Sequence, residues 1–332
     1  MRRLLFLLAA FFLFPSLLQR TMRIALALET APAVTDLTQL LAPGRHVVSI
    51  QVDDRDRTFI FITPAGFKPG RPLPIVFFFH GAGGRAEQAA TTYGWAEKAD
   101  AENFFAVFPQ GLPARPDAEG SFLLNPNIWR DERAGLPVVG VNDVHFFETL
   151  LGALQGALPI DPRRIYVTGF SNGAGMTFTL GSHFSDRIAA IAPVSSQSFI
   201  HIDSLARPLP VYYLAGTADP LVLYQGGTAT LPWGNSRTLP PVQESVDTWA
   251  RLDGCPPEPQ VVSDGNGVHV LRYGPGRGQA EVLFTTIEGN GHHWPGSVEP
   301  LPRAISGPAL DPFRATDQIW AFFQRHPLPE DR

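Results

Sequence analysis

The sequence contains a single cysteine, Cys255, among 332 residues. One thiol cannot form an internal disulfide, and no cysteine near the N-terminus is available for lipid attachment. We expect Cys255 to fill a small buried or half-buried site. A chain of this length can still bury a substantial core, either in one large α/β domain or in two small ones.

Lysine is also scarce, because only Lys68 and Lys98 contribute to the 26 basic residues. The arginines are scattered singly, the formal net charge is -5, and the isoelectric point is near 6.0. We interpret the shortage of lysine as coding bias. The sequence has no basic stripe of the kind that binds phosphates, so we do not expect nucleic acid as a partner.

The apolar run at the N-terminus is too short for a membrane span, which needs about 20 residues. It extends from Leu4 to Phe14, follows Arg2 and Arg3, and ends before Pro15. This pattern is typical of an export signal. We therefore expect residues 1–33 to be a signal peptide or an uncleaved N-terminal anchor, the only expected membrane contact, and the protein to be secreted or periplasmic.

No internal repeat, low-complexity tract or break in composition divides the remaining sequence, so we expect a single domain over residues 45–328. Two alternating, β-branched segments at its start predict an antiparallel hairpin. The continuous apolar runs that follow predict strands covered on both faces. The predicted strands are 46–52, 57–64, 73–81, 104–111, 164–170, 188–196, 209–217 and 281–289.

Predicted helices alternate with the later strands. The clearest covers 142–158, where apolar residues recur every three or four positions behind the cap Asn142. The other predicted helices are 86–103, 172–183, 241–252 and 312–324. This order predicts a mostly parallel central sheet with helices on both faces and an antiparallel N-terminal hairpin. The proline-rich stretch 112–140 has no predicted strand, and we expect it at the rim of a site.

The stretch GFSNGAG, residues 169–175, lies between a predicted strand and a predicted helix. Its G-x-S-x-G pattern is typical of a tight turn that holds the hydroxyl of Ser171 in an exposed, strained position. Taken alone, the pattern also fits an ordinary glycine-rich turn.

Complementary groups follow two other predicted strands. Asp219 comes after strand 209–217, and His292 and His293 come after strand 281–289. Ligands of parallel sheets bind at the carboxyl ends of the strands. The chain order Ser, Asp, His is that of α/β-hydrolase triads, in which a carboxylate orients the imidazole that takes the serine proton. The spacing leaves either histidine open as the base.

The developing oxyanion of such a reaction needs donors already in place. The backbone N–H of Asn172 follows the candidate nucleophile, and the glycine-rich stretch HGAGG supplies the N–H of Ala82 or Gly81. We expect His80 of the same stretch to brace the loop rather than to transfer protons.

Further candidates lie near the predicted site. Trp129 and Trp294 are on predicted loops, where they either stack on substrate or pack as loop hydrophobes, and His293 is a candidate for substrate contact. A metal pair at His292 and His293 is not expected, because neighbouring side chains diverge and no carboxylate motif accompanies them. We expect neither a metal nor another cofactor.

Taken together, seven segments resemble the polyhydroxybutyrate depolymerase and feruloyl esterase branch of the α/β hydrolases, over residues 72–294. They are FFFHGAGG, NIWRDE, VNDVHFF, IDPRRIYVTGFSNGAGM, IAPVSS, GTADPLVLYQGG and GNGHHWPG. The resemblance implies an α/β-hydrolase fold and a secreted serine esterase without a cofactor. It assigns the triad to Ser171, Asp219 and His292, because the family's His-x-Trp-Pro pattern matches His292.

The sequence departs from that family at Ala174, where glycine is more common, at His293, where a small residue is common, and at Cys255, which has no partner. We predict a serine carboxylic-ester hydrolase acting on hydroxyalkanoate oligomers, feruloyl esters or acetyl esters, with a small-molecule or polymer-derived ester as its partner. The alternatives are an acyltransferase of the same fold and a catalytically inactive binding protein on this scaffold.

Overall fold

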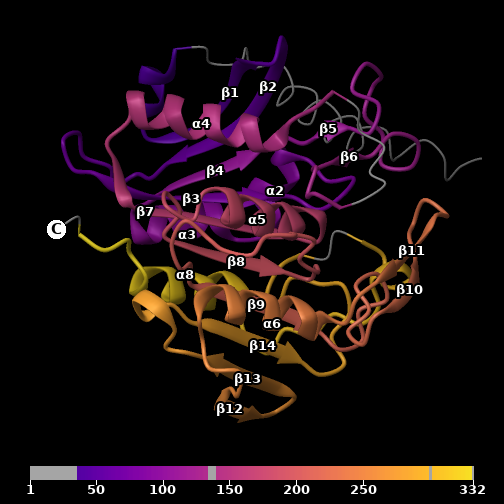
Figure 1. Cartoon of the computed structure of the whole chain (residues 1–332). Helices are drawn as coiled ribbons and strands as arrows, with labels where there is room; N and C mark the ends of the chain where they lie inside the picture. The colour runs from indigo at the N-terminus through magenta and orange to yellow at the C-terminus, as the bar shows by residue number, and fades with distance from the viewer. Residues whose placement is uncertain (1–35, 134–139, 299–300, 331–332) are drawn as a thin grey trace, which may run out of the picture.

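The computed structural model describes residues 36–133, 140–298 and 301–330, so the expected export segment 1–33 lies outside the described residues. Ten strands form one sheet in the order β1-β2-β4-β3-β7-β8-β9-β14-β13-β12, which Figure 1 shows from top to bottom. These strands are β1 (Gly44–Val52), β2 (Arg55–Thr63), β3 (Leu73–Phe79), β4 (Phe105–Pro109), β7 (Ile160–Phe170), β8 (Ala190–Val194), β9 (Val211–Gly216), β12 (Gln260–Gly265), β13 (Val268–Tyr273) and β14 (Val282–Ile287).

The central strands of the sheet, from β4 to β14, run parallel to one another. The N-terminal hairpin β1-β2 joins them antiparallel at one edge, and β13 and β12 continue antiparallel at the other. The prediction of a mostly parallel sheet with an antiparallel N-terminal hairpin is confirmed. Within the described part of the chain, no helix combines the length and apolar character needed to cross a membrane.

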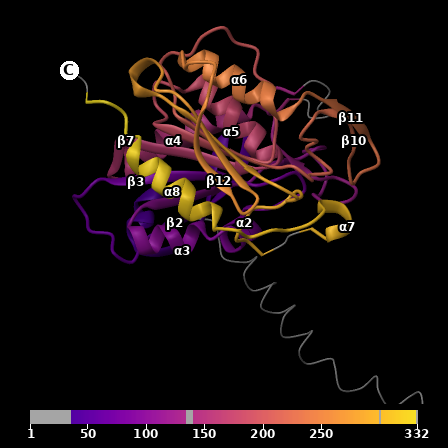
Figure 2. The same cartoon turned by 90° about the horizontal axis from the view of Figure 1, so that it is seen from below.

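Helices cover both faces of the sheet, as Figure 2 shows in the perpendicular view. One face carries α4 (Asp143–Ala157), α5 (Asn172–His183) and α6 (Val242–Asp253), and the other carries α2 (Ala86–Thr92), α3 (Trp95–Glu102) and α8 (Ala315–Arg325). Two hydrophobic cores result, one on each side of the strands. A short helix, α7 (Arg303–Ser306), lies in the C-terminal part, and short 3₁₀ turns cover Leu37–Leu41 and Arg277–Gln279.

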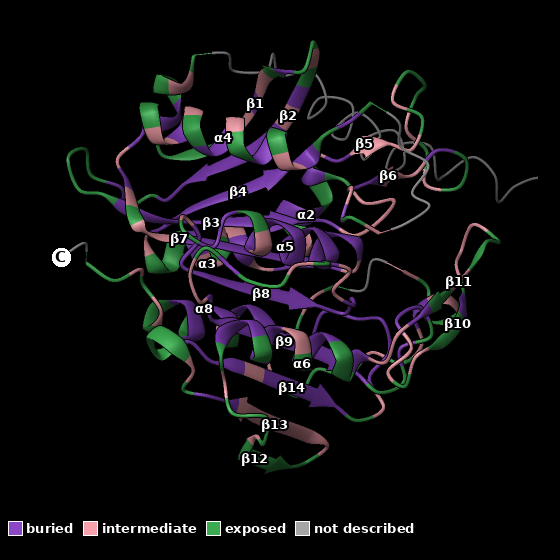
Figure 3. Cartoon of the chain, in the orientation of Figure 1, coloured by how far each residue is buried: buried purple, intermediate pink, exposed green. Residues whose placement is uncertain are grey.

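Alternation along β3 explains how one strand serves both cores. All seven of its residues are buried, as the sequence LPIVFFF predicts for a strand covered on both faces. Phe77 packs edge-on against Phe147 of α4, with ring centroids 5.1 Å apart, whereas Phe78 stacks on Tyr93 at 4.6 Å on the opposite face. Figure 3 shows the central strands buried and β12 exposed at the edge.

The structure corrects three expectations about the elements. The predicted helix 86–103 is two helices, α2 and α3, because Gly94 adopts a left-handed conformation (φ 73°) between them. The stretch 112–140 is not strandless, since the short strands β5 (Leu112–Pro113) and β6 (Asn127–Ile128) pair within it. Two hairpins were not predicted at all, β12-β13 and the small pair β10 (Gly227–Thr230) with β11 (Ser236–Leu239).

Candidate active site

Ser171 occupies the turn between β7 and α5, as the G-x-S-x-G pattern predicts. Its backbone has φ 56° and ψ -121°, an unfavourable region for a residue with a side chain, at a cost of about 1–3 kcal/mol. The turn is held by the Ser171 N–H, which donates to the carbonyl of Val194 at 2.9 Å. The next strand therefore fixes the turn at the carboxyl edge of the sheet.

Two glycines make this turn possible because other backbone passes directly against them. A Cβ at Gly169 would lie 2.5 Å from the carbonyl oxygen of Gly173 and 2.8 Å from that of Phe79. A Cβ at Gly173 would overlap the carbonyl groups of Phe79 and His80. The glycines of the motif therefore allow β3, β7 and α5 to converge at Ser171.

Asp219 and His292 meet at the same edge of the sheet. Asp219 lies on the loop after β9, and His292 lies on the loop after β14, a neighbouring strand. The carboxylate of Asp219 accepts the N–H groups of Leu221 and Val222, each at 2.8 Å, through Oδ1. Its Oδ2 is 2.7 Å from Nδ1 of His292, and both side chains are almost completely buried. The imidazole is thus held with Nδ1 toward the carboxylate, which leaves Nε2 available for another partner.

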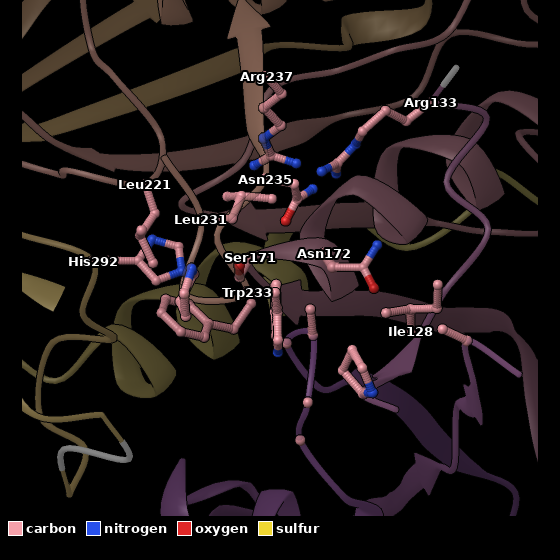
Figure 4. A pocket seen from close by; sticks show the side chains of 18 of the residues that line it. Ile128, Arg133, Ser171, Asn172, Leu221, Leu231, Trp233, Asn235, Arg237 and His292 are labelled. Carbon is pink, nitrogen blue, oxygen red and sulfur yellow. The ribbon is translucent and has the colours of Figure 1, made fainter. Parts of the chain in front are cut away.

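Ser171 and His292 line one cavity of about 1040 Å³. Figure 4 shows the two side chains turned toward one another in that cavity. The described structure contains no hydrogen bond between Ser171 and His292. In unliganded enzymes such hydrogen bonds are often long, and they shorten when substrate binds. The ring of Phe170 supports the imidazole, with ring centroids 4.7 Å apart.

Candidate oxyanion donors surround the same space, since Asn172, Ala82 and Gly81 all line the cavity. Asn172 is the first residue of α5, and N–H groups in the first turn of a helix have no partner within the helix. In the glycine-rich loop, the N–H of Gly83 donates to Asn127 at 2.7 Å and that of Gly84 donates to Gly81 at 3.0 Å. The amides of Gly81 and Ala82 are therefore the remaining candidate donors.

His80 braces this loop, as predicted from its position in HGAGG. Its ring is buried, Nδ1 lies 2.8 Å from the carbonyl oxygen of Gly81, and Nε2 accepts the N–H of Gly111 at 3.0 Å. Burial lowers the pKa of His80 to about 4, so the ring is neutral at physiological pH. A neutral ring with hydrogen on Nδ1 satisfies both contacts.

The structure places Trp129, Trp294 and His293 away from the cavity surface. The Trp129 indole donates to the carbonyl of His80 at 2.9 Å, and that of Trp294 donates to Thr316 Oγ1 at 3.2 Å. His293 is paired with Asp311 at 2.8 Å. All three side chains are buried and none lines the cavity, so the suggested substrate contacts are wrong and these residues pack the loops around the site.

Sequence reasoning missed the role of Asp131, which anchors the start of α5. Its side chain is completely buried, accepts Asn172 Nδ2 at 3.1 Å, and pairs with Arg133. Burial raises the pKa of Asp131 against the opposing effect of Arg133. The Asn172 side chain also joins both backbone groups of Trp129, at 2.7 and 3.0 Å. NIWRDE was recognised as a motif, but its contact with the nucleophile turn required the fold.

A second group that the sequence did not reveal lines the cavity. Trp233, in the loop between β10 and β11, donates through its indole N–H to the carbonyl of Phe122 at 2.5 Å, and the two rings lie 5.8 Å apart. This contact joins the unpredicted hairpin to the loop 121–125 across the cavity. Arg237, on β11, also lines the cavity. The sequence analysis did not predict this hairpin, so it did not identify these residues as part of the site.

The described residues contain no group of three or more His, Cys, Asp or Glu side chains arranged to hold a metal ion. Cys255 is half-buried, with Sγ 3.8 Å from the carbonyl oxygen of Ala280. Burial raises the pKa of this thiol to about 11, which keeps it protonated and unreactive. The structure thus gives Cys255 the packing role expected from the sequence.

Comparisons with known proteins agree with this fold. No family model matches the sequence. The chain is 30% identical over 254 residues to the putative esterase NocK of Nocardia uniformis subsp. tsuyamanensis, covering 72% of this chain and 70% of that protein. It is 29% identical over 241 residues to feruloyl esterase B of Piromyces equi, covering 71% of this chain but only 42% of that longer protein.

Among solved structures, an acetyl xylan esterase from Aspergillus awamori has the same fold, with a TM-score of 0.53, 14% identity, and coverage of 84% of this chain and 99% of that one. The order of strands, the turn after β7 and the esterase relatives lead to one classification. The chain belongs to the α/β-hydrolase esterase family.

Proposed function

We propose that the protein is a serine carboxylic-ester hydrolase that works through an acyl-Ser171 intermediate. The observation that carries this proposal is the buried Asp219–His292 pair, 2.7 Å apart, whose imidazole faces the strained Ser171 turn in one cavity. A serine is activated when a neutral imidazole accepts its proton, and a carboxylate holds that imidazole in the required tautomer.

In the proposed first half-reaction, Ser171 Oγ attacks the ester carbonyl carbon while His292 Nε2 accepts the hydroxyl proton. The oxyanion receives hydrogen bonds from the N–H of Asn172 and from that of Ala82 or Gly81, each such donor being worth about 10² to 10³ in rate. Collapse of the tetrahedral intermediate expels the alcohol, which takes the proton from His292. The acyl group then remains bonded to Ser171 Oγ.

In the second half-reaction, His292 takes a proton from water, and the resulting hydroxide attacks the acyl carbonyl. The acid leaves and Ser171 recovers its proton from His292. Asp219 orients His292 and stabilises the imidazolium that forms twice in the cycle. The residues in the described chain supply every proton transfer of this cycle.

Feruloyl and acetyl esters are the substrates that we propose first, since relatives that share the fold are named for feruloyl esterase and acetyl xylan esterase activity. We propose that residues 45–328 form the catalytic domain; the ten-stranded sheet extends from Gly44 to Ile287, and α8 completes the core on one face.

A hydrolysis panel tests the proposed function. Short and long acyl 4-nitrophenyl esters, methyl ferulate, acetylated xylan and hydroxybutyrate oligomers are assayed with the wild type and with Ser171→Ala, with and without an added alcohol acceptor. The proposal predicts hydrolysis of at least one ester class by the wild type alone. Equal activity of the two proteins on every substrate would refute the mechanism, and acyl transfer that exceeds hydrolysis at modest acceptor concentration would replace it with an acyltransferase.

A further inference from the structure

Two arginines that the proposed mechanism does not use line the same cavity as Ser171. Arg133 follows β6 in the sequence. Arg237 lies on β11, more than 100 residues later. Figure 4 shows both side chains extending from these separate elements toward the same part of the cavity, close to Asn235. Their convergence is a feature of the fold that sequence spacing does not show.

We propose that Arg237, assisted by Arg133, binds a carboxylate on the substrate, so that half-esters of dicarboxylic acids are preferred over the matching neutral esters. This inference rests on the proposed esterase function and names a substrate class for it. The reacting ester would lie at Ser171, and the free carboxylate at the other end of the same molecule would lie against the arginines.

Arg133 is held firmly by its neighbours. Its guanidinium pairs with the buried Asp131 and lies over the ring of Phe199, 4.4 Å from the ring centroid. Nε of Arg133 is buried and has no hydrogen-bond partner in the described structure. The charge of Arg133 is thus offset by Asp131, and its guanidinium is held in one place beside the cavity.

Arg237 carries the positive charge that is not offset. The described residues provide no ion pair or hydrogen bond to its guanidinium, and its Nε is buried without a partner. Its backbone is fixed by the pairing of β11 with β10, where Arg237 faces Ala229. A buried donor without an acceptor is costly, and native structures seldom keep one without a ligand, ion or water to satisfy it.

The other titratable side chains of the cavity do not neutralise Arg237. The carboxylate of Glu132 is bonded to His183 at 2.5 Å, and His292 is paired with Asp219. His201 also lines the cavity and is exposed. Arg237 is therefore the charged side chain of this cavity to which the described residues give no ion-pair partner.

Carboxylate is the anion that best fits this arrangement. A guanidinium binds a carboxylate through two parallel hydrogen bonds. The apolar side chains of Leu231, Trp233 and Leu239 line the same cavity. A cavity of about 1040 Å³ accommodates an alkyl spacer along these residues between ester and carboxylate.

The experiment compares two esters that differ only in charge. Mono-4-nitrophenyl esters of adipate and suberate are assayed beside the same esters with the free carboxyl converted to a primary amide. We expect the wild type to prefer the acids by about tenfold or more in kcat/KM, mainly through KM, because charged hydrogen bonds are strong. In Arg237→Gln the acid-to-amide ratio falls to about one, and in Arg237→Lys it is intermediate because the paired donors are lost.

Because the acid and the amide are compared within the same variant, a change in the fraction of folded protein cancels from the ratio of their kcat/KM values. Arg251→Gln removes a charge from the exposed end of α6, outside the cavity, and keeps the wild-type ratio and activity. A wild-type ratio near one, or an equal ratio in wild type and Arg237→Gln, would overturn the subsite.

A binding measurement separates this inference from the proposed function. Suberate, but not suberamide, should raise the melting temperature of the wild type and of Ser171→Ala, and should leave Arg237→Gln unchanged. If no ester is hydrolysed but this pattern appears, the esterase function fails while the carboxylate subsite stands. Equal shifts by suberate in all three proteins, or none, would refute the subsite.

Discussion

At the scale of single residues, the adjacent histidines show how strongly position determines chemistry. His292 lies in the cavity against Asp219, whereas His293 points away and pairs with Asp311. Of the two, only His292 therefore shares the cavity with Ser171, whose backbone is strained.

This difference gives a paired prediction. Replacement of either Ser171 by Ala or His292 by Gln should lower kcat by a factor on the order of 10⁶, as in comparable triads. His293→Gln should keep kcat close to that of the wild type, since it removes only the contact with Asp311. Stopped-flow and long-time assays on one 4-nitrophenyl ester measure all three variants, and equal losses in His292→Gln and His293→Gln would contradict the assignment.

His80 makes stability depend on pH. The pKa of His80 is about 4 in the folded protein because the ring is buried, and about 6.5 in the unfolded chain. Between these values the unfolded state binds more protons, so the free energy of unfolding falls as the pH drops from 6.5 to 4, by ~3 kcal/mol in total. Above pH 6.5 His80 contributes no pH dependence.

Urea unfolding at a series of pH values measures this effect. His80→Gln should be less stable at pH 7, because the contacts to Gly81 and Gly111 are lost, but its stability should decline less steeply below pH 6.5. If the free energy of unfolding changes with pH in the same way in both proteins, the pKa of His80 is not lowered by folding.

At the scale of secondary-structure elements, the close approach of β3, β7 and α5 determines the geometry of the site. Gly173→Ala should destabilise the protein by about 3 kcal/mol, because its Cβ would overlap the backbone of Phe79 and His80. Gly152→Ala is the matched control: it lies inside α4, with no atom within 4 Å of the added Cβ, and should stabilise by about 0.4–1 kcal/mol. Thermal unfolding compares them, and similar effects at both positions would contradict the packing described.

Sequence predicted the elements whose signals are local. The apolar run of β3, the cap Asn142 and the strand-turn-helix at Ser171 are readable because a few neighbouring residues determine each. The β12-β13 hairpin was also readable in principle, since the turn at Asn266 and Gly267 joins two alternating segments. The break between α2 and α3 was signalled by Thr91, Thr92 and Gly94, which are weak helix formers, but the prediction extended one helix through them.

Burial and convergence were beyond sequence reasoning. Trp129 and Trp294 lie on loops, which suggested exposure, yet both rings pack beneath the site. Arg133 and Arg237 line one cavity although Arg237 lies on β11, a strand of the hairpin that the sequence analysis did not predict. The placement of Ser171, Asp219 and His292 at one edge was an exception, because the carboxyl ends of parallel strands meet at the same edge of the sheet.

At the scale of the whole molecule, the sheet ends in an open edge. All six residues of β12 are exposed, and Val261 and Val262 have relative exposures of 67% and 57%. An exposed edge with apolar side chains is a template for pairing with another chain. The opposite edge, β1, is partly covered by its contacts with α4.

Val261→Lys should therefore reduce aggregation of the intact protein. We expect a higher onset temperature for light scattering and unchanged kcat/KM, because β12 is the edge strand and none of its residues lines the cavity. Val298→Lys adds the same charge at an equally exposed site that is not in a strand, and should change the onset little. Equal effects of both variants would assign the change to net charge.

The most direct measurement of the central claim is covalent labelling with a fluorophosphonate followed by peptide mass spectrometry. Such probes react with a serine only when a base has activated it. The account predicts one adduct, on Ser171, in the wild type, and loss of labelling in both Ser171→Ala and His292→Gln. A folded wild type that is not labelled, or an adduct on another residue that persists in both variants, would contradict it.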